Sequence, residues 1–198
     1  MFEFLSKPAR ERRKAISVLE AMRGRDWQCH SCSETHNDLQ ELGAVSPDPW
    51  PHIETYSENG DLWNWIDRDF LSEDFCVIDG ENFMVRGVMP MPVVGMPGLT
   101  WAFGVWSTLS RENFDIYVDE FDTGRPIDDG TRWPGWFCNR IDGFEQAYMK
   151  PCWVVPQINR KRPYIFPQDG SLGKGQAPAD GIEPTELLNL LRKSGHSL

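Results

Sequence analysis

The sequence predicts an α+β fold with a mainly antiparallel sheet, a few flanking helices and an N-terminal Cys/His metal turn. Three observations support this: helical periodicity at both ends of the chain, short aromatic and β-branched runs in the middle, and a Cys-x-x-Cys stretch near the start. The length of 198 residues suits one domain with short additions. We expect a helical extension over residues 1–26, a main domain over 27–170, and a linker with a C-terminal helix over 171–198.

The first part of the chain predicts one amphipathic helix followed by loops. Over residues 8–24, apolar side chains recur at steps of three and four among Arg, Lys and Glu, and Gly24 can end the helix in a left-handed conformation. The Cys-rich stretch follows at once. Residues 43–61 contain Pro47, Pro49 and Pro51 and are expected to form a loop.

The middle of the chain predicts a β-hairpin, then a strand that leads into a helix. In FCVIDGENFMVRGVMPM, two strand-like runs at 75–78 and 83–88 flank Asp79-Gly80, a dipeptide that readily takes the positive φ angles of a tight turn. The run LTWAFGVWSTL over 99–109 is typical of a central strand. Ser110 is placed to cap a helix that buries Phe114, Tyr117, Val118 and Phe121.

The last part predicts short strands and a terminal helix. The runs WFCNRI (136–141), AYMKPCWVVPQ (147–157) and RPYIFP (162–167) are expected to be strands or sheet edges, since proline is confined to sheet margins. A Gly-rich linker then precedes PTELLNLLRKSG, in which Pro184 suits a first helical turn and Gly195 a helix end.

The charge is strongly acidic and unevenly distributed. The formal net charge is −10, which disfavours binding to phosphate backbones or anionic lipid. Between residues 54 and 81 the chain carries nine acidic residues and one basic residue, Arg68, together with Trp63 and Trp65. An acidic surface with exposed aromatic rings can bind a basic protein partner, although a merely solvated face has the same composition.

The sequence also predicts a cytoplasmic protein with reduced thiols. No apolar run approaches the roughly 18 residues that cross a bilayer, and charges occupy the positions where a signal peptide is apolar. Five cysteines are an odd number and the chain is long enough to bury a core, so a disulfide framework is not expected.

The stretch WQCHSCSETH predicts a zinc-type turn at residues 29–36. Two cysteines three positions apart can hold one ion from a single turn, and His36 is close enough to add a third ligand. The predicted metal ligands are therefore Cys29, Cys32 and His36. A redox pair or a pair of unliganded cysteines are the alternatives, but the redox motif needs a helix that starts at the first cysteine.

The fourth ligand is not evident from the sequence. If water took that position, the zinc site would be open to catalysis, with Glu34 as the carboxylate within the turn. No nucleophile elbow, phosphate loop or metalloprotease helix motif occurs in the chain. The candidates for a fourth ligand are Cys76, Cys138, Cys152, His30 and His52.

The stretches WQCHSCSETH, FCVIDGENFMVRG, FGVWSTLSRENFDIY and GWFCNRIDGF resemble the bacterial domain-of-unknown-function 2199 family over residues 27–168. The resemblance implies a shared fold and a metal turn, but no activity. The helix before residue 26 looks like an extension of the family pattern, and GSLGKGQAPADGI stands where that pattern has a His-Pro loop. The matching positions are Cys29, Cys32, His36, Asp79, Gly80, Arg86, Gly87, Ser110, Glu112, Asn113 and Phe114.

Together these features favour a noncatalytic cytoplasmic zinc-binding protein that binds another protein through its acidic aromatic surface. In its concrete form this is an immunity-type protein that neutralises a basic toxin domain. The alternatives are a metal-dependent hydrolase with an open zinc site, and nucleic-acid binding through the zinc turn and the basic stretch NRKRP at 159–163, which the net charge disfavours. Neither the oligomeric state nor the identity of a partner follows from the sequence.

Overall fold

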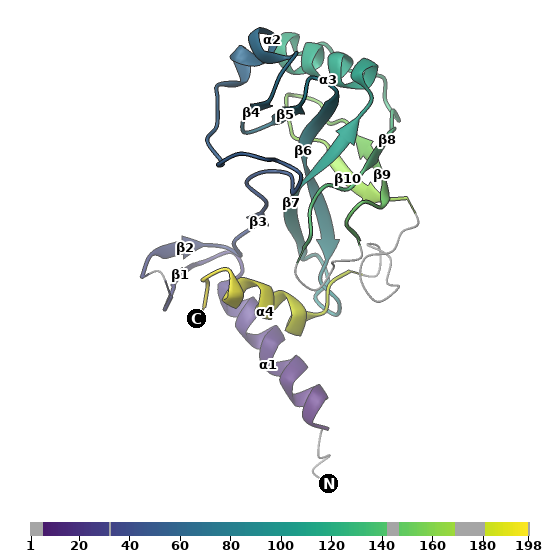
Figure 1. The fold of residues 1–198 in the computed structure, drawn as a ribbon. Helices are drawn as coiled ribbons and strands as arrows, with labels where there is room; N and C mark the ends of the chain where they lie inside the picture. Colours follow the sequence, from purple (N-terminus) through teal and green to yellow (C-terminus); the bar gives the residue numbers. More distant parts are fainter. Residues whose placement is uncertain (1–5, 32, 142–146, 169–180, 198) are drawn as a thin grey trace. The chain divides into compact units, whose positions relative to one another are not determined.

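The computed structural model describes residues 6–31, 33–141, 147–168 and 181–197 (Figure 1). The fold is α+β: within these residues, four α-helices accompany a two-stranded sheet and an eight-stranded sheet. The chain forms two compact units, one within residues 1–42, 91–101 and 179–198, the other within 43–90 and 102–178. The domain boundaries expected at residues 26 and 170 stay a prediction. None of the described helices is long and apolar enough to cross a membrane.

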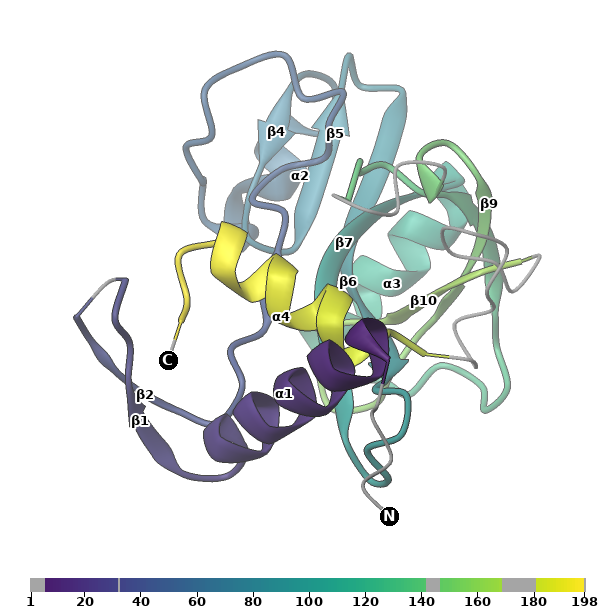
Figure 2. The same cartoon turned by 90° about the horizontal axis from the view of Figure 1, so that it is seen from below.

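The first unit is built on two helices and a small hairpin. Helices α1 (Lys7–Met22) and α4 (Pro184–Lys193) lie side by side, as both views show (Figures 1 and 2). Strands β1 (Asp26–Gln28) and β2 (Thr35–Asn37) pair antiparallel. The Nε of Arg12 contacts Glu183 Oε2 at 3.0 Å, which links α1 to the residue before α4. The helices bury Ala15, Leu19, Met22, Leu187, Leu188, Leu190 and Leu191, as their apolar periodicity predicts.

The eight-stranded sheet contains both strand orientations. Its order is β3-β7-β6-β10-β9-β8, with β5 beside β6 and β4 beside β5. The pairs β4–β5, β5–β6, β8–β9 and β9–β10 are antiparallel, but β10 pairs parallel with β6 through Tyr164 and Val88. The bounds are β3 Leu42–Gly43, β4 Phe70–Leu71, β5 Phe75–Ile78, β6 Asn82–Pro92, β7 Thr100–Leu109, β8 Trp133–Trp136, β9 Pro151–Val155 and β10 Tyr164–Pro167.

The predicted Asp79-Gly80 hairpin is confirmed. Strands β5 and β6 pair antiparallel, with Phe75 opposite Val85 and Ile78 opposite Asn82. Asp79 and Gly80 have φ angles of 57° and 66°. A side chain at Gly80 would also place its Cβ 2.8 Å from the backbone of Asp67. The turn therefore needs glycine for its backbone conformation and for its close packing.

Helix α3 (Arg111–Thr123) follows β7 and begins where the sequence indicates. The Ser110 hydroxyl accepts a hydrogen bond from the Asn113 N–H at 3.3 Å, which satisfies one free amide of the first turn. Phe114 and Tyr117 are fully buried, and Phe114 meets Phe75 edge to face with 5.8 Å between ring centroids. Between β3 and β4, the short helices η1 (Asn59–Asp61) and α2 (Leu62–Trp65) follow the proline-rich segment.

One strand lies earlier than expected. The run WFCNRI was expected to be a strand or sheet edge, but β8 ends at Trp136 and only an isolated bridge joins Phe137 to Ser107. The reason is a side chain: the Asn139 amide oxygen accepts the Trp106 N–H at 2.8 Å, and its nitrogen donates to the Ser46 carbonyl at 2.9 Å. The N–H groups of Phe137 and Cys138 still donate to backbone carbonyls, and from Asn139 onward these side-chain bonds take the place of a regular ladder.

Candidate metal centre

The β1–β2 hairpin places Cys29 and His36 on one face. Trp27 pairs directly with His36, and Cys29 lies two positions beyond Trp27, so the three side chains point the same way from the pleated strands. The Cys29 N–H donates to the Glu34 carbonyl at 2.9 Å, and the Ser33 N–H donates back to the Cys29 carbonyl at 3.1 Å. The turn that follows β1 is therefore tight and hydrogen-bonded at its base.

Trp27 anchors this face of the hairpin. Its side chain is buried, its ring centroid lies 4.9 Å from that of His36, and its Nε1 donates to the Asp38 carbonyl at 2.9 Å. The Asp38 carboxylate in turn accepts backbone N–H bonds from Gly24 and Leu39, which lower the pKa of Asp38. The His36 ring thus packs against Trp27, and the hydrogen bond to Asp38 holds the Trp27 side chain in place.

The end of α4 places His196 beside the hairpin. The His196 N–H donates to the Leu191 carbonyl at 2.8 Å, and the Gly195 N–H donates to the Arg192 carbonyl at 3.1 Å. Gly195 has a φ angle of 85°, which reverses the chain as a helix-ending glycine does. The LLRKSGH segment therefore determines where the His196 side chain begins.

The last described residues are also bonded to the cysteine turn. The Ser197 carbonyl accepts the His30 N–H at 2.8 Å, and the hydroxyls of Ser31 and Ser197 lie 2.7 Å apart. The Ser197 nitrogen lies 3.5 Å from Cys29 Sγ, and the same sulfur lies 3.6 Å from the Gly195 carbonyl oxygen. Backbone and side-chain bonds thus join the C-terminal tail to the turn that carries Cys29.

Cys29, His36 and His196 form a group that can hold a metal ion. One ligand atom from each lies within 4.8 Å of the other two. Cys29 is 1% exposed and both histidines are half-buried. The His196 Nδ1 is buried and has no hydrogen-bond partner among the residues that the structure describes. A buried nitrogen without a partner costs free energy, and coordination to an ion would satisfy it.

The structure brings together two of the three predicted ligands. Cys29 and His36 lie in the group, whereas Cys32 lies outside the described residues. Sequence reasoning missed His196, for which the available signal was a histidine directly after a helix-ending glycine. Of the suggested fourth ligands, His30 is exposed in the turn and His52 pairs with Asp69 at 2.5 Å. Glu34 is exposed and contributes its backbone carbonyl to the turn.

The remaining described cysteines are buried thiols in the second unit. Burial raises the pKa of Cys138 to about 12 and that of Cys152 to about 11. The same cause raises the pKa of Cys76 further above its ordinary value. The Cys152 Sγ also lies 3.0 Å from the Ser107 hydroxyl. These environments favour the protonated thiol, which is neither a nucleophile nor a metal ligand.

The basic stretch at 159–163 is engaged within the protein. Arg162 Nε lies 2.8 Å from Asp74 Oδ1, and Arg160 donates to the Asp122 carbonyl at 2.7 Å. These contacts use groups that nucleic-acid binding would need for phosphate contacts.

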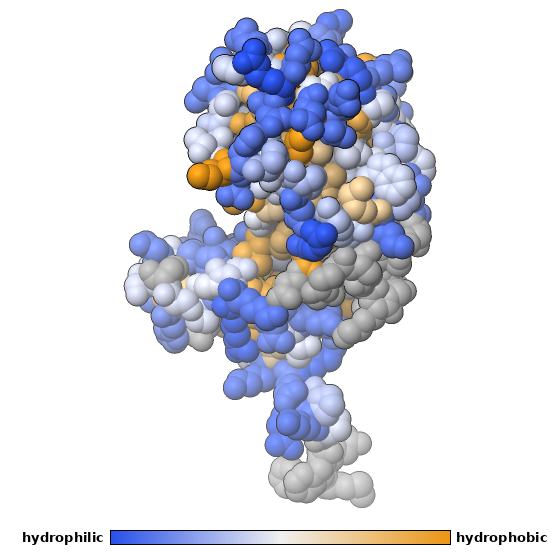
Figure 3. Space-filling model, in the orientation of Figure 1, coloured by the Kyte–Doolittle hydropathy of each residue, from blue (hydrophilic) through white to orange (hydrophobic). Residues whose placement is uncertain are grey.

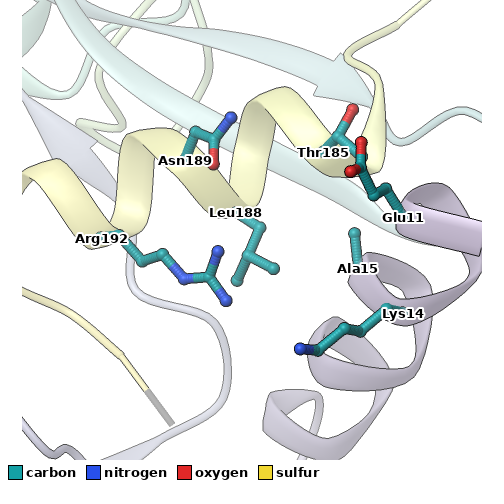
Figure 4. Close-up of a pocket in the computed structure, with 7 residues that line it drawn as sticks. All are labelled: Glu11, Lys14, Ala15, Thr185, Leu188, Asn189 and Arg192. Carbon is teal, nitrogen blue, oxygen red and sulfur yellow. The ribbon is translucent and has the colours of Figure 1, made fainter. Parts of the chain in front are cut away.

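A shallow cavity of about 270 Å³ lies between α1 and α4 in the first unit (Figure 4). Ala15 and Leu188 form its apolar floor, and the side chains of Lys14 and Arg192 extend toward the same space. The cavity does not contain the metal-ligand group. Glu11 also lines it, so its charged groups are two basic side chains and one acidic one.

The comparisons with known proteins give a family but no activity. No curated protein and no solved structure matches the chain. A family described as "Uncharacterized protein conserved in bacteria (DUF2199)" matches residues 28–182. The match includes Cys29 and His36, whereas α1 and His196 lie outside it. The chain, with its cysteine–histidine hairpin and Asp79-Gly80 turn, thus belongs to this uncharacterised bacterial family.

Proposed function

We propose that the chain is a noncatalytic, cytoplasmic zinc-binding protein that binds another protein through an acidic aromatic surface. We define this surface as the exposed residues between 54 and 81. The concrete version is an immunity-type protein that neutralises a basic toxin domain. The zinc ion, in this proposal, stabilises the first unit, and the acidic surface in the second unit binds the partner.

The donor set supports zinc as the metal. Thiolate and imidazole ligands are those that zinc prefers, and the three described donors are one sulfur and two ring nitrogens. Cys32 would complete a tetrahedral Cys₂His₂ set from the same turn. Such a set supports a structural site, because four protein ligands leave no position for a reacting water. The hydrolase alternative needs an open position and is therefore less well supported.

The position of His196 supports a stabilising role for the ion. The three donors come from the hairpin after α1 and from the end of α4, so one ion would join both ends of the described chain. A metal bound by residues far apart in sequence stabilises the folded state because the unfolded chain lacks the preformed site. Free cysteines at Cys76, Cys138 and Cys152 are in keeping with the reducing cytoplasm.

The exposure of the acidic aromatic surface supports a protein partner. Trp63 and Trp65 are 47% and 42% exposed, although tryptophan is usually mostly buried. Figure 3 shows mainly hydrophilic side chains over the α2 end of the second unit. Arg68 already lies over the Trp65 ring at 4.7 Å, so the geometry for binding a guanidinium group exists here. The exposed acids of the surface are Glu54, Glu58, Asp61, Asp67, Glu73, Asp79 and Glu81.

One observation carries the proposal: an exposed Trp63 lies in a segment whose exposed charges are almost all negative. Tryptophan is enriched among the residues that contribute most to protein interfaces, and negative charge selects a basic partner. The test is a binding measurement with the purified product of a neighbouring gene, chosen for its basic charge. Calorimetry would compare the wild type with Trp63→Ala and with Trp136→Ala, which removes an equally exposed tryptophan outside the surface.

We expect Trp63→Ala to weaken binding by about tenfold or more, a loss of at least about 1.4 kcal/mol. Trp136→Ala should bind like the wild type, and higher salt should weaken the wild-type complex. Equal losses in both variants would argue against the acidic aromatic surface. The absence of any stable complex, with neighbouring products and after purification from the native host, would argue against the protein-binding role.

A further inference from the structure

A cavity of about 360 Å³ lies beside the C-terminal half of α3, within the second unit. It is separate from the residues of the acidic aromatic surface. The apolar side chains that line it are those of Ile116, Ile127 and Trp133. Glu120 and Asp128 are among the acidic side chains of the lining. A recess of this size and composition suits a small ligand with an apolar body and a charged end.

Glu120 is the unusual residue in this lining. It is only 3% exposed, and its Oε2 atom has no hydrogen-bond partner among the described residues. The same burial raises the pKa of Glu120, because the carboxylate is poorly hydrated. A buried acceptor without a donor is rare in folded proteins, since it loses its hydration without compensation.

The neighbouring loop satisfies one side of this carboxylate only. The backbone N–H of Arg160 donates to the Glu120 carboxylate, while the Arg160 side chain bonds the Asp122 carbonyl at 2.7 Å. Asn159 and Arg160 both have positive φ angles, 64° and 57°, which non-glycine residues rarely adopt. The loop conformation thus serves one carboxylate oxygen and leaves the other without a donor.

The charge around Glu120 selects a cation. The cavity lining contains three carboxylates and the guanidinium of Arg125, which pairs with Asp119 at 2.7 Å. That pair leaves Glu120 and Asp128 without a cationic partner among the lining residues, while the positive charge of Arg160, outside the lining, favours the ionised form of Glu120. Within the described residues, these carboxylates do not form a group of three close ligand atoms, which disfavours a divalent metal ion. An organic cation, which needs no such convergence, fits the cavity better.

We propose that this cavity binds an alkylammonium group. Its charge lies toward Glu120 and Asp128, and its alkyl chain lies against Ile116 and Trp133. The ring of Trp133, 8% exposed, adds apolar area and a face that attracts cations. The ammonium group belongs either to a free small amine or to a lysine side chain of a protein. This inference is independent of the zinc site and of the acidic aromatic surface.

The test uses n-butylammonium chloride with the full-length protein, followed by NMR of isoleucine methyl groups. We expect saturable shifts at Ile116 and Ile127, with a dissociation constant on the order of 1 mM for so small a ligand. Ile53, which is 84% exposed and does not line the cavity, is the control reporter. Neutral n-butanol tests the role of the charge, and Nα-acetyl-lysine amide distinguishes a lysine side chain from a free amine.

The matched variants are Glu120→Gln and Glu112→Gln, an exposed acid on the same helix outside the cavity. Glu120→Gln keeps the shape of the side chain and an oxygen that can accept the Arg160 N–H. We expect it to weaken butylammonium binding about tenfold or more, and Glu112→Gln to leave it unchanged. Unweakened binding to Glu120→Gln would overturn the proposal. Three other results would also overturn the proposal: n-butanol that binds as tightly as n-butylammonium, displacement of n-butylammonium by millimolar calcium, or the absence of saturable shifts.

Discussion

The imidazole rings of His36 and His196 lie edge to face, with 4.9 Å between their centroids, although they come from opposite ends of the described chain. His36 reaches this position through the β1–β2 register and His196 through the glycine that ends α4. Cys29 completes the group from the same face of the hairpin. Two local motifs, each short in sequence, thus form one candidate metal centre.

Replacing His196 should weaken zinc binding strongly. We expect His196→Ala to lower zinc affinity by more than about 100-fold. Loss of a residue that only supports a ligand costs up to about 100-fold in metal affinity, and loss of a ligand itself should cost more. The measurement is elemental mass spectrometry with a chelator competition. His30→Ala is the control, because His30 is exposed in the same turn and lies outside the described ligand group. Wild-type affinity in His196→Ala would remove this residue from the site.

Zinc removal should release the tail before it affects the second unit. The amide of His30, bonded to the Ser197 carbonyl, should exchange hydrogen faster after chelation, because the ion no longer holds both segments. The amide of Phe114, bonded to the Ser110 carbonyl in α3, should keep its exchange rate. Hydrogen exchange followed by NMR measures both. Unchanged exchange at His30 would contradict a stabilising role of the ion in the tail contact.

The charge of Asp69 should make stability depend on pH. The Asp79 N–H and His52 both donate to this carboxylate, and these bonds lower the pKa of Asp69. A lowered folded-state pKa means that the stabilisation is complete above the pKa of the unfolded chain and is lost as pH falls through the folded-state pKa. We expect Asp69→Asn to cost about 1 kcal/mol at neutral pH, allowing for solvent screening, and less in acid.

Urea denaturation at several pH values measures this difference. Glu81→Gln, a change of an exposed acid on the same hairpin, is the control and should show little difference. A penalty for Asp69→Asn that does not decrease in acid would show that charge is not its cause.

The turn at Gly80 should not tolerate a side chain. Gly80→Ala should destabilise the protein by more than about 1 kcal/mol, because alanine disfavours a φ of 66° and its Cβ would lie 2.8 Å from Asp67. Gly60→Ala has no heavy atom within 4 Å of the added Cβ and should be nearly neutral. Thermal unfolding of both variants tests this. Equal melting temperatures would contradict the steric argument.

The buried cysteines should resist alkylation in the native protein. Burial raises the pKa of Cys138 to about 12 and that of Cys152 to about 11, so little thiolate exists near neutral pH. We expect iodoacetamide to modify these residues at least about 100-fold more slowly than in unfolded protein. Peptide mass spectrometry after timed labelling measures the rates. Rapid labelling of Cys138 in folded protein would contradict its buried environment.

The sequence by itself determined the local elements of this protein. The Asp79-Gly80 turn, the Ser110 cap and the helix ends at Pro184 and Gly195 depend on backbone preferences and hydrogen bonds within a few residues. The proximity of Cys29 and His36 is also local, since only seven positions separate them in the chain. Such features can be predicted because the interacting residues are close in the chain.

Only the tertiary structure decided the features that join distant residues. No periodicity or spacing connects His196 with Cys29, pairs β10 in parallel with β6, or places Glu120 beside the Arg160 loop. Each of these contacts depends on how whole elements pack, and packing is decided by the buried area and hydrogen bonds of many residues together. The candidate metal centre was therefore half predictable: Cys29 and His36 were predicted as ligands from their spacing, whereas the β1–β2 pairing and the C-terminal histidine follow from the fold.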